Sequence, residues 1–160
     1  MQANQWVQFC VSTPTQRAVA DVLEQSEQPY EGFPSYYAYI CDLYEKKRDH
    51  MVQSLIAASL VPIKPEGGFF VIADTSAHPD SKIQSQYWDQ PAPNGESPVT
   101  RDWAFARWLT VEHGVTPIPP SAFYTSETRH LAKNLARFAI CKKDETLEEA
   151  RTRLAKLKNV

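Results

Sequence analysis

Several features that would place a protein in a specialised class are missing from this 160-residue sequence. The three cysteines, Cys10, Cys41 and Cys141, are widely spaced and odd in number, which argues against a disulfide framework or a zinc ribbon and indicates a reducing compartment. No stretch approaches the roughly 18 apolar residues that a membrane helix needs, and no secretory leader opens the chain. The net charge of -2 provides no general attraction for nucleic acid or anionic lipid. We therefore expect a soluble cytoplasmic protein, or a mitochondrial one if a transit peptide precedes it, with no nucleic-acid or membrane partner.

Sequence signals for nucleotide and metal binding are also missing. The chain has only five glycines, and they form neither a dinucleotide-binding fingerprint nor a phosphate loop ending in Gly-Lys-Ser/Thr. The glycine pair within residues 66–70 is explained more simply as the turn of a hairpin. No histidine has a His-x-x-x-His or Cys/His spacing, so we predict no metal site. The four histidines are His50, His78, His113 and His130.

Apolar periodicity and twelve prolines organise the rest of the chain. Helical spacing predicts helices over residues 13–25, 35–59, 101–113 and 146–157, the last opened by a Thr146…Glu149 capping box, and a short helix over 127–134. β-rich runs predict a hairpin of residues 60–64 and 69–74 and further strands over 115–120 and 135–141. Residues 77–100 are expected to form a long surface loop, and the charged run 45–49 a solvated helix face. This order predicts an α+β fold in which helices cover a short sheet.

Arg137 is the most informative single residue because it interrupts the otherwise apolar run 135–140. A guanidinium in such a strand must be compensated by a partner. One reading is a structural ion pair, for example with Asp74. The other is a receptor for the α-carboxylate of an amino acid, which the planar guanidinium can bind with two hydrogen bonds.

Five segments in order resemble the C-terminal part of class I/II aminotransferases, most closely the kynurenine (glutamine transaminase K) and methionine aminotransferases. Each segment alone is weakly specific, but the shared order and spacing are specific. The likeness covers nearly the whole chain. The segments are VSTPTQ at 11–16, KRDHM at 47–51, PEGGFFVIAD at 65–74, VTPIPPSAFY at 115–124 and RFAICKKDETL at 137–147.

The resemblance implies a fold and a division of the chain. Residues 35–160 would be the C-terminal small domain of a fold-type I pyridoxal-phosphate enzyme, with a short, mostly antiparallel sheet covered by helices and a long joining helix before it. Residues 1–34 would be a linker and a remnant of the large domain. The full-length family members are homodimers that use pyridoxal phosphate to transfer an amino group from an amino acid to a 2-oxo acid.

The resemblance also implies roles for particular residues. Arg137 matches the family arginine that binds the substrate α-carboxylate. Val11 and Ser12 match the segment that reaches the neighbouring subunit's substrate pocket. Kynurenine-type members often have an aromatic residue followed by His or Thr there, so the preferred donor is left open among kynurenine, glutamine and methionine.

The family's Schiff-base lysine and main cofactor-binding residues lie upstream of the VSTPTQ segment, and none precedes Met1. None of the nine lysines has the surroundings of that residue; six lie in charged, solvated stretches (Lys46, Lys47, Lys142, Lys143, Lys156, Lys158), and the others are Lys64, Lys82 and Lys133. We therefore expect the isolated chain to be inactive without the missing N-terminal large domain. The alternative is a non-catalytic, stand-alone binding or dimerisation module derived from this domain. Such a module would have to leave the apolar face of the 13–25 helix uncovered.

Overall fold

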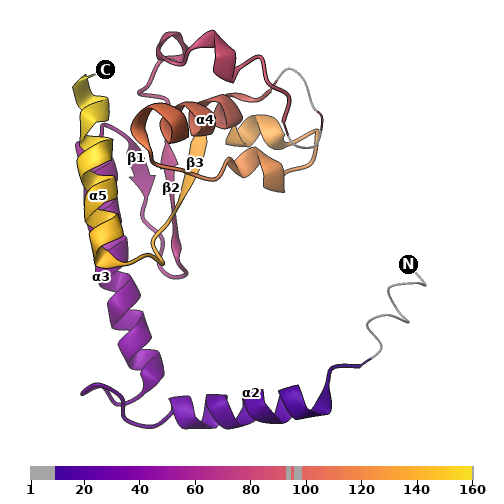
Figure 1. Ribbon diagram of the computed structural model, residues 1–160, viewed down its shortest axis with the longest axis vertical. Helices are drawn as coiled ribbons and strands as arrows, with labels where there is room; N and C mark the ends of the chain where they lie inside the picture. The colour runs from indigo at the N-terminus through magenta and orange to yellow at the C-terminus, as the bar shows by residue number, and fades with distance from the viewer. Residues whose placement is uncertain (1–9, 93–94, 96–98, 160) are drawn as a thin grey trace. The chain divides into compact units, whose positions relative to one another are not determined.

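The computed structural model describes residues 10–92, 95 and 99–159. The helices are α2 (Thr13–Ser26), α3 (Tyr36–Ala57), α4 (Arg101–His113) and α5 (Asp144–Ala155), and the strands are β1 (Val61–Ile63), β2 (Phe70–Asp74) and β3 (Leu135–Ala139). Short 3-10 helices lie at Asp80–Lys82 (η1), Ser85–Tyr87 (η2), Pro120–Phe123 (η3), Arg129–Ala132 (η4) and Lys156–Asn159 (η5). The chain divides into two compact units, with the boundary inside α3 between Leu43 and Tyr44 (Figure 1). The predicted α+β class and all four long helices are confirmed.

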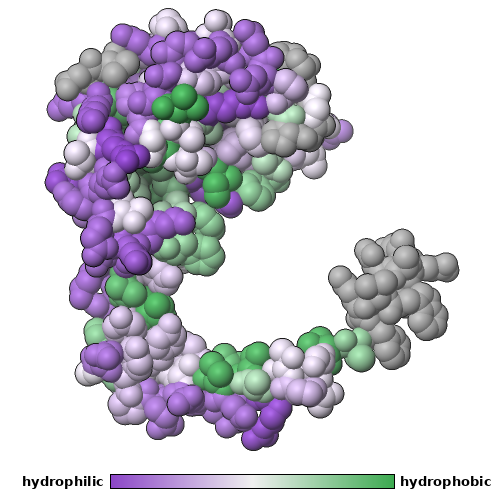
Figure 2. All heavy atoms as spheres, in the orientation of Figure 1, coloured by the Kyte–Doolittle hydropathy of each residue, from purple (hydrophilic) through white to green (hydrophobic). Residues whose placement is uncertain are grey.

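The N-terminal unit contains α2 and the first part of α3. Pro14 lies in the first turn of α2, where its missing amide hydrogen costs no helical bond. None of the residues of α2 is buried, and hydrophobic residues gather on its surface (Figure 2). The expected apolar face is therefore exposed: Val19, Val22 and Leu23 are 51%, 59% and 53% exposed. At the start of α3, four aromatic rings (Tyr30, Phe33, Tyr36, Tyr39) contact one another edge-on or tilted.

The C-terminal unit is built on a three-stranded sheet in the order β1-β2-β3, and both pairs of strands are antiparallel. The predicted hairpin is confirmed as β1 and β2, with Gly68 at a φ of +77° in the turn between them. Across the sheet, Ile63 lies opposite Ile72, and Ile72 lies opposite Arg137. This register decides which side chains share a face, because neighbouring residues of a strand point to opposite sides.

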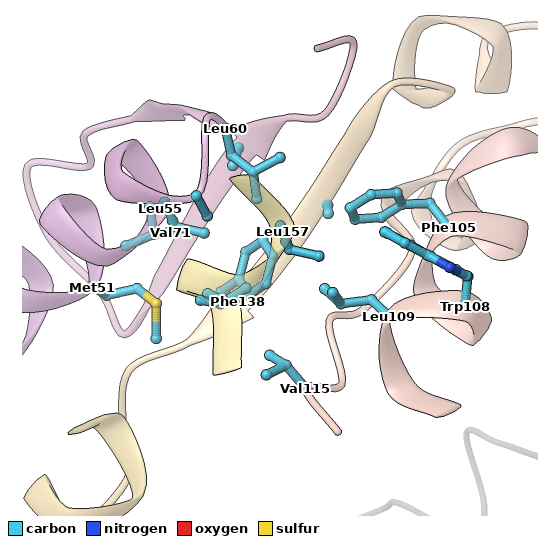
Figure 3. Close-up of a cluster of buried hydrophobic side chains, with 14 of the residues drawn as sticks. Met51, Leu55, Leu60, Val71, Phe105, Trp108, Leu109, Val115, Phe138 and Leu157 are labelled. Carbon is cyan, nitrogen blue, oxygen red and sulfur yellow. The ribbon is translucent and has the colours of Figure 1, made fainter. Parts of the chain in front are cut away.

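One face of the sheet belongs to the hydrophobic core. Val71 and Phe138 point from it into a cluster with side chains of the end of α3, of α4 and of η5 (Figure 3). The buried residues labelled there are Met51, Leu55, Leu60, Val71, Phe105, Trp108, Leu109, Val115, Phe138 and Leu157. α5 runs alongside the second half of α3 (Figure 1), and the contact includes Lys47–Asp144 at 2.9 Å and His50–Glu148 at 3.2 Å. Within the described residues, no helix is long and apolar enough to span a membrane.

Three predicted elements differ from the structure. Residues 115–120 form no strand; a single bridge joins Ile118 to Arg137, because the prolines in this segment cannot donate ladder hydrogen bonds. The Thr146…Glu149 capping box is wrong: α5 begins two residues earlier, after Lys143, with no side-chain cap. Its first turn instead carries Asp144 and Glu145, whose charges favour a helix N-terminus. The predicted 127–134 helix is reduced to η4.

The expected surface loop 77–100 is only partly a surface loop. Its described part contains η1 and η2 and buries apolar side chains against the core. The polar composition of the segment therefore gave no indication of these buried residues. Its buried residues are His78, Ile83, Tyr87, Ala92 and Val99. Within the loop, residues 93–94 and 96–98 lie outside the described residues.

Candidate functional site

Arg137 lies at the centre of β3, on the sheet face opposite the core. Its neighbour Phe138 is buried in the core, as the alternation predicts. β2 pairs with β3 along one edge, and Ile118 bonds to the backbone of Arg137 along the other. The Arg137 amide donates to the Ile118 carbonyl at 3.0 Å, and the Ile118 amide donates to the Arg137 carbonyl at 2.8 Å. The residue therefore stands on a rigid strand with hydrogen-bonded neighbours on both sides.

Two phenyl rings flank the guanidinium of Arg137. The Cζ atom lies 4.2 Å from the ring centroid of Phe70 and 4.3 Å from that of Phe123. Phe70 begins the neighbouring strand β2, whereas Phe123 ends η3. Such distances are within the range of cation–π attraction. The site is thus a cation in contact with two aromatic rings on a half-exposed sheet face.

Within the described part of the chain, the guanidinium has no ion pair. Its Nε atom is buried and has no hydrogen-bond partner. Asp74, which the ion-pair hypothesis suggested as the partner of Arg137, instead accepts a hydrogen bond from the Ser76 amide at 2.7 Å. A buried donor without an acceptor is costly, so this side chain is not explained by a structural hydrogen bond or ion pair within the described residues. The geometry suits a planar anion such as a carboxylate, which a guanidinium binds with two parallel hydrogen bonds.

Val11 and Ser12 belong to the N-terminal unit, whereas Arg137 belongs to the C-terminal one. Val11 and Ser12 are exposed, and Ser12 directly precedes α2. The Gln16 side chain donates to the Val11 carbonyl and the Gln16 amide to the Ser12 carbonyl, each at 3.0 Å. Their side chains are therefore left available at the surface of that unit.

The expectation that residues 45–49 form a solvated face is wrong for two of its cations. The side chains of Lys47 and Arg48 are only 12% and 13% exposed, and both are held by carboxylates. Asp49 accepts from Arg48 at 2.9 Å and pairs with Lys64 at 3.0 Å. These two contacts, that of Arg48 first, lower the pKa of Asp49 to about 2. Lys47 and Lys64 are thus structural ion-pair partners.

The residues around Arg137 do not fit pyridoxal phosphate by themselves. The described side chains that contact the guanidinium are two phenyl rings, which can neither anchor a phosphate nor bind an aldehyde. A cofactor of this kind needs a reactive lysine amine, and Lys47 and Lys64 are each engaged by a carboxylate. What the described residues suit is the carboxylate end of a substrate.

Phe70 and Phe123 were not identified as site residues from the sequence. Both lie in segments that resemble the aminotransferases, PEGGFFVIAD and VTPIPPSAFY. They were missed because an aromatic residue in an apolar stretch predicts packing in the core. The available signal was the register of the predicted strands, which places residue 70 near residue 137 once β2 and β3 are paired.

Comparisons with known proteins agree in pointing to one family. The family model described as Aminotransferase class I and II matches residues 2–154. The kynurenine–oxoglutarate transaminase of Dictyostelium discoideum is 41% identical over 97% of this chain, and the methionine aminotransferase of Escherichia coli K12 is 32% identical over 98%. The chain spans 34% and 33% of these two proteins, about a third of their length.

Solved structures give the same result. Bna3p of Saccharomyces cerevisiae, named as a candidate kynurenine aminotransferase, superposes with a TM-score of 0.77 at 32% identity, covering 99% of this chain and 35% of that one. YbdL of Escherichia coli, for which a methionine aminotransferase function was identified, has a TM-score of 0.66 at 31% identity, covering 98% and 34%. Sequence and structure therefore select the same group of relatives.

Proposed function

Because this chain belongs to the class I and II aminotransferase family, we propose that it is the C-terminal portion of a pyridoxal-phosphate-dependent aminotransferase. Its fold is the predicted small α+β domain of fold-type I aminotransferases. The whole enzyme transfers an amino group from an amino acid of the kynurenine, glutamine or methionine type to a 2-oxo acid, as a homodimer. Residues 35–160 are its small domain, and residues 1–34 are a linker and a remnant of the large domain.

The observation that carries this proposal is the unpaired guanidinium of Arg137 between Phe70 and Phe123. Arg137 binds the α-carboxylate of the amino acid through two parallel hydrogen bonds and so orients the Cα–H bond that reacts. Val11 and Ser12 extend toward the substrate pocket of the neighbouring subunit.

When bound, pyridoxal phosphate supplies the electron sink for proton removal at Cα. This chain spans about a third of its relatives, and we place the Schiff-base lysine and phosphate-binding groups in the remaining part of the whole enzyme.

The test is a chimera in which this chain replaces the matching C-terminal third of the Dictyostelium transaminase. We expect it to bind the cofactor and to transfer amino groups from kynurenine, glutamine or methionine to a 2-oxo acid. Arg137→Leu removes a bidentate, charge-assisted contact and lowers kcat/KM about 100-fold or more, since roughly 3 kcal/mol of transition-state stabilisation is lost.

Arg151→Leu is the matched control. Arg151 is exposed on α5 and pairs with Glu148 there, so its removal leaves kcat/KM unchanged. Normal kcat/KM in the Arg137→Leu chimera would exclude the carboxylate role. An inactive chimera together with a cooperative melt of the isolated chain would favour the stand-alone module instead.

A further inference from the structure

The two rings beside Arg137 differ in how they are supported. Phe70 is half-buried and lies on β2, where it also contacts Phe69 with ring centroids 4.7 Å apart. Phe123 is 63% exposed, yet its ring lies against the cation at 4.3 Å. An exposed phenyl contributes little to the core of this unit, and the contact with Arg137 is the ring interaction that Phe123 makes within the described residues.

A buried carboxylate anchors the turn that carries Phe123. Asp102, in the first turn of α4, accepts the Ser121 backbone amide at 2.8 Å through Oδ2 and the Thr100 hydroxyl at 2.6 Å through Oδ1. The hydroxyls of Thr100 and Ser121 lie 3.1 Å apart. Asp102 and Ser121 are both buried, so η3 is attached to α4 two residues before Phe123. The exposed ring is therefore held by a buried network.

The rings also decide which part of the guanidinium faces outward. Both ring centroids lie within 4.3 Å of Cζ, and Nε is buried without a partner. Nη1 and Nη2 are not among the buried atoms that lack a partner within the described residues. Only the outward end of the guanidinium can then meet an acceptor, in its own plane.

We propose that Phe123, anchored through Ser121 to Asp102, is a positioning residue that clamps the Arg137 guanidinium against Phe70. Before the substrate binds, the clamp already holds the two Nη atoms in the orientation that the substrate carboxylate requires. This inference rests on the proposed function, in which Arg137 binds that carboxylate. A free arginine side chain loses rotamer freedom on binding, and a clamped one has already lost it.

The first experiment uses the chain itself and needs no activity. In ¹⁵N-labelled protein, the Nε–H resonance of Arg137, assigned by its loss in Arg137→Lys, should be shifted upfield by the two ring currents. Phe123→Leu should move it toward the position of a free arginine, and Phe123→Trp should keep it shifted. A resonance at the free-arginine position in the unaltered chain would overturn the clamp.

The second experiment measures kinetics in the active chimera. Phe123→Leu should raise KM for the amino acid donor about fivefold and leave kcat within about twofold of that of the unaltered chimera. Phe123→Trp keeps an aromatic ring there and should leave KM unchanged. A merely structural role would instead lower the thermal midpoint and the amount of active enzyme without this split. Unchanged KM in Phe123→Leu alongside a strong loss in Arg137→Leu would refute the clamp and leave the proposed function intact. No loss in Arg137→Leu would refute the proposed function itself.

Discussion

α2 and α4 have nearly the same length, 14 and 13 residues, but opposite relations to the rest of the chain. α4 buries six residues, among them Phe105, Trp108 and Leu109, whereas α2 buries none. Both sequences contain apolar residues at helical spacing. The difference shows that the spacing of apolar residues predicts a helix, whereas burial of that helix depends on whether other elements are present to pack against it. In the proposed function, the surfaces that would cover α2 belong to the two thirds of the enzyme that this chain does not span.

The strongest way to test this comparison is to remove a large side chain from α4. Trp108 is 1% exposed and contacts the rings of Phe105 and His113 with centroids 5.6 and 4.8 Å away. Trp108→Ala should lower the free energy of unfolding by about 3–5 kcal/mol, since it leaves a cavity in the core. Chemical denaturation followed by circular dichroism measures the change.

Val111→Ala is the control on the same helix, because Val111 is 67% exposed. Its effect should stay within about 0.5 kcal/mol. If Trp108→Ala cost no more than this control, α4 would not be part of a packed core, and the contrast with α2 would fail.

A smaller effect is expected from pH, through a histidine that packs on α4. His78 is 5% exposed and lies beside Phe105 and Trp108, and burial, followed by the charge of Arg101, lowers its pKa below the ordinary 6.5. His113, whose ring also contacts Trp108, has a pKa lowered mainly by burial. The unfolded chain therefore takes up protons at a higher pH than the folded one, so stability is complete above about pH 6.5 and falls as the pH drops below it.

Thermal midpoints measured between pH 7.5 and 5.5 test this direction. His78→Gln should make the midpoint less dependent on pH, whereas His130→Gln, at an exposed position, should leave the dependence unchanged. A midpoint that rises on acidification through this range would contradict the assignment.

The smallest change in stability is expected on α2. Val22→Gln replaces a 59% exposed valine and should alter the free energy of unfolding by no more than about 0.5 kcal/mol. The same change should reduce self-association, because it interrupts an exposed apolar face. Analytical ultracentrifugation of the chain at several concentrations measures this. A destabilisation of 2 kcal/mol or more would mean that α2 packs against another surface in solution.

Much of the fold could be predicted because its signals are local. The spacing of apolar residues placed α3 and α4 to within about two residues, and Gly114, at a φ of +67°, ends α4 as a C-terminal glycine should. The errors have non-local causes. Residues 115–120 align beside β3 without forming a strand because of their prolines, and the polar loop 77–100 is attached through side chains such as Ile83 that find pockets in the core. Ile56 of α3 is 53% exposed although it is apolar, which its place in a helix does not predict.

The candidate site shows the same division. Arg137 could be singled out from its sequence neighbours, since a charge inside an apolar strand is conspicuous. Its opposition to Phe138 followed from alternation. The contact with Phe70 required the register of β2 against β3, which only the structure supplied. The absence of an ion pair with Asp74 and the contact with Phe123 had no signal in the sequence, because Phe123 lies on a turn fourteen residues before Arg137.

Local chain chemistry was sufficient for the helices, the hairpin, the two faces of β3 and, through ordered motifs, the resemblance to aminotransferases. These properties depend on backbone geometry and short-range periodicity, which any window of sequence carries. Packing alone decided that α4 is buried and α2 is not, that Lys47 is an ion-pair partner, and that two rings enclose the guanidinium. Each of those outcomes depends on distances between residues far apart along the chain, and such distances exist only once the chain has folded.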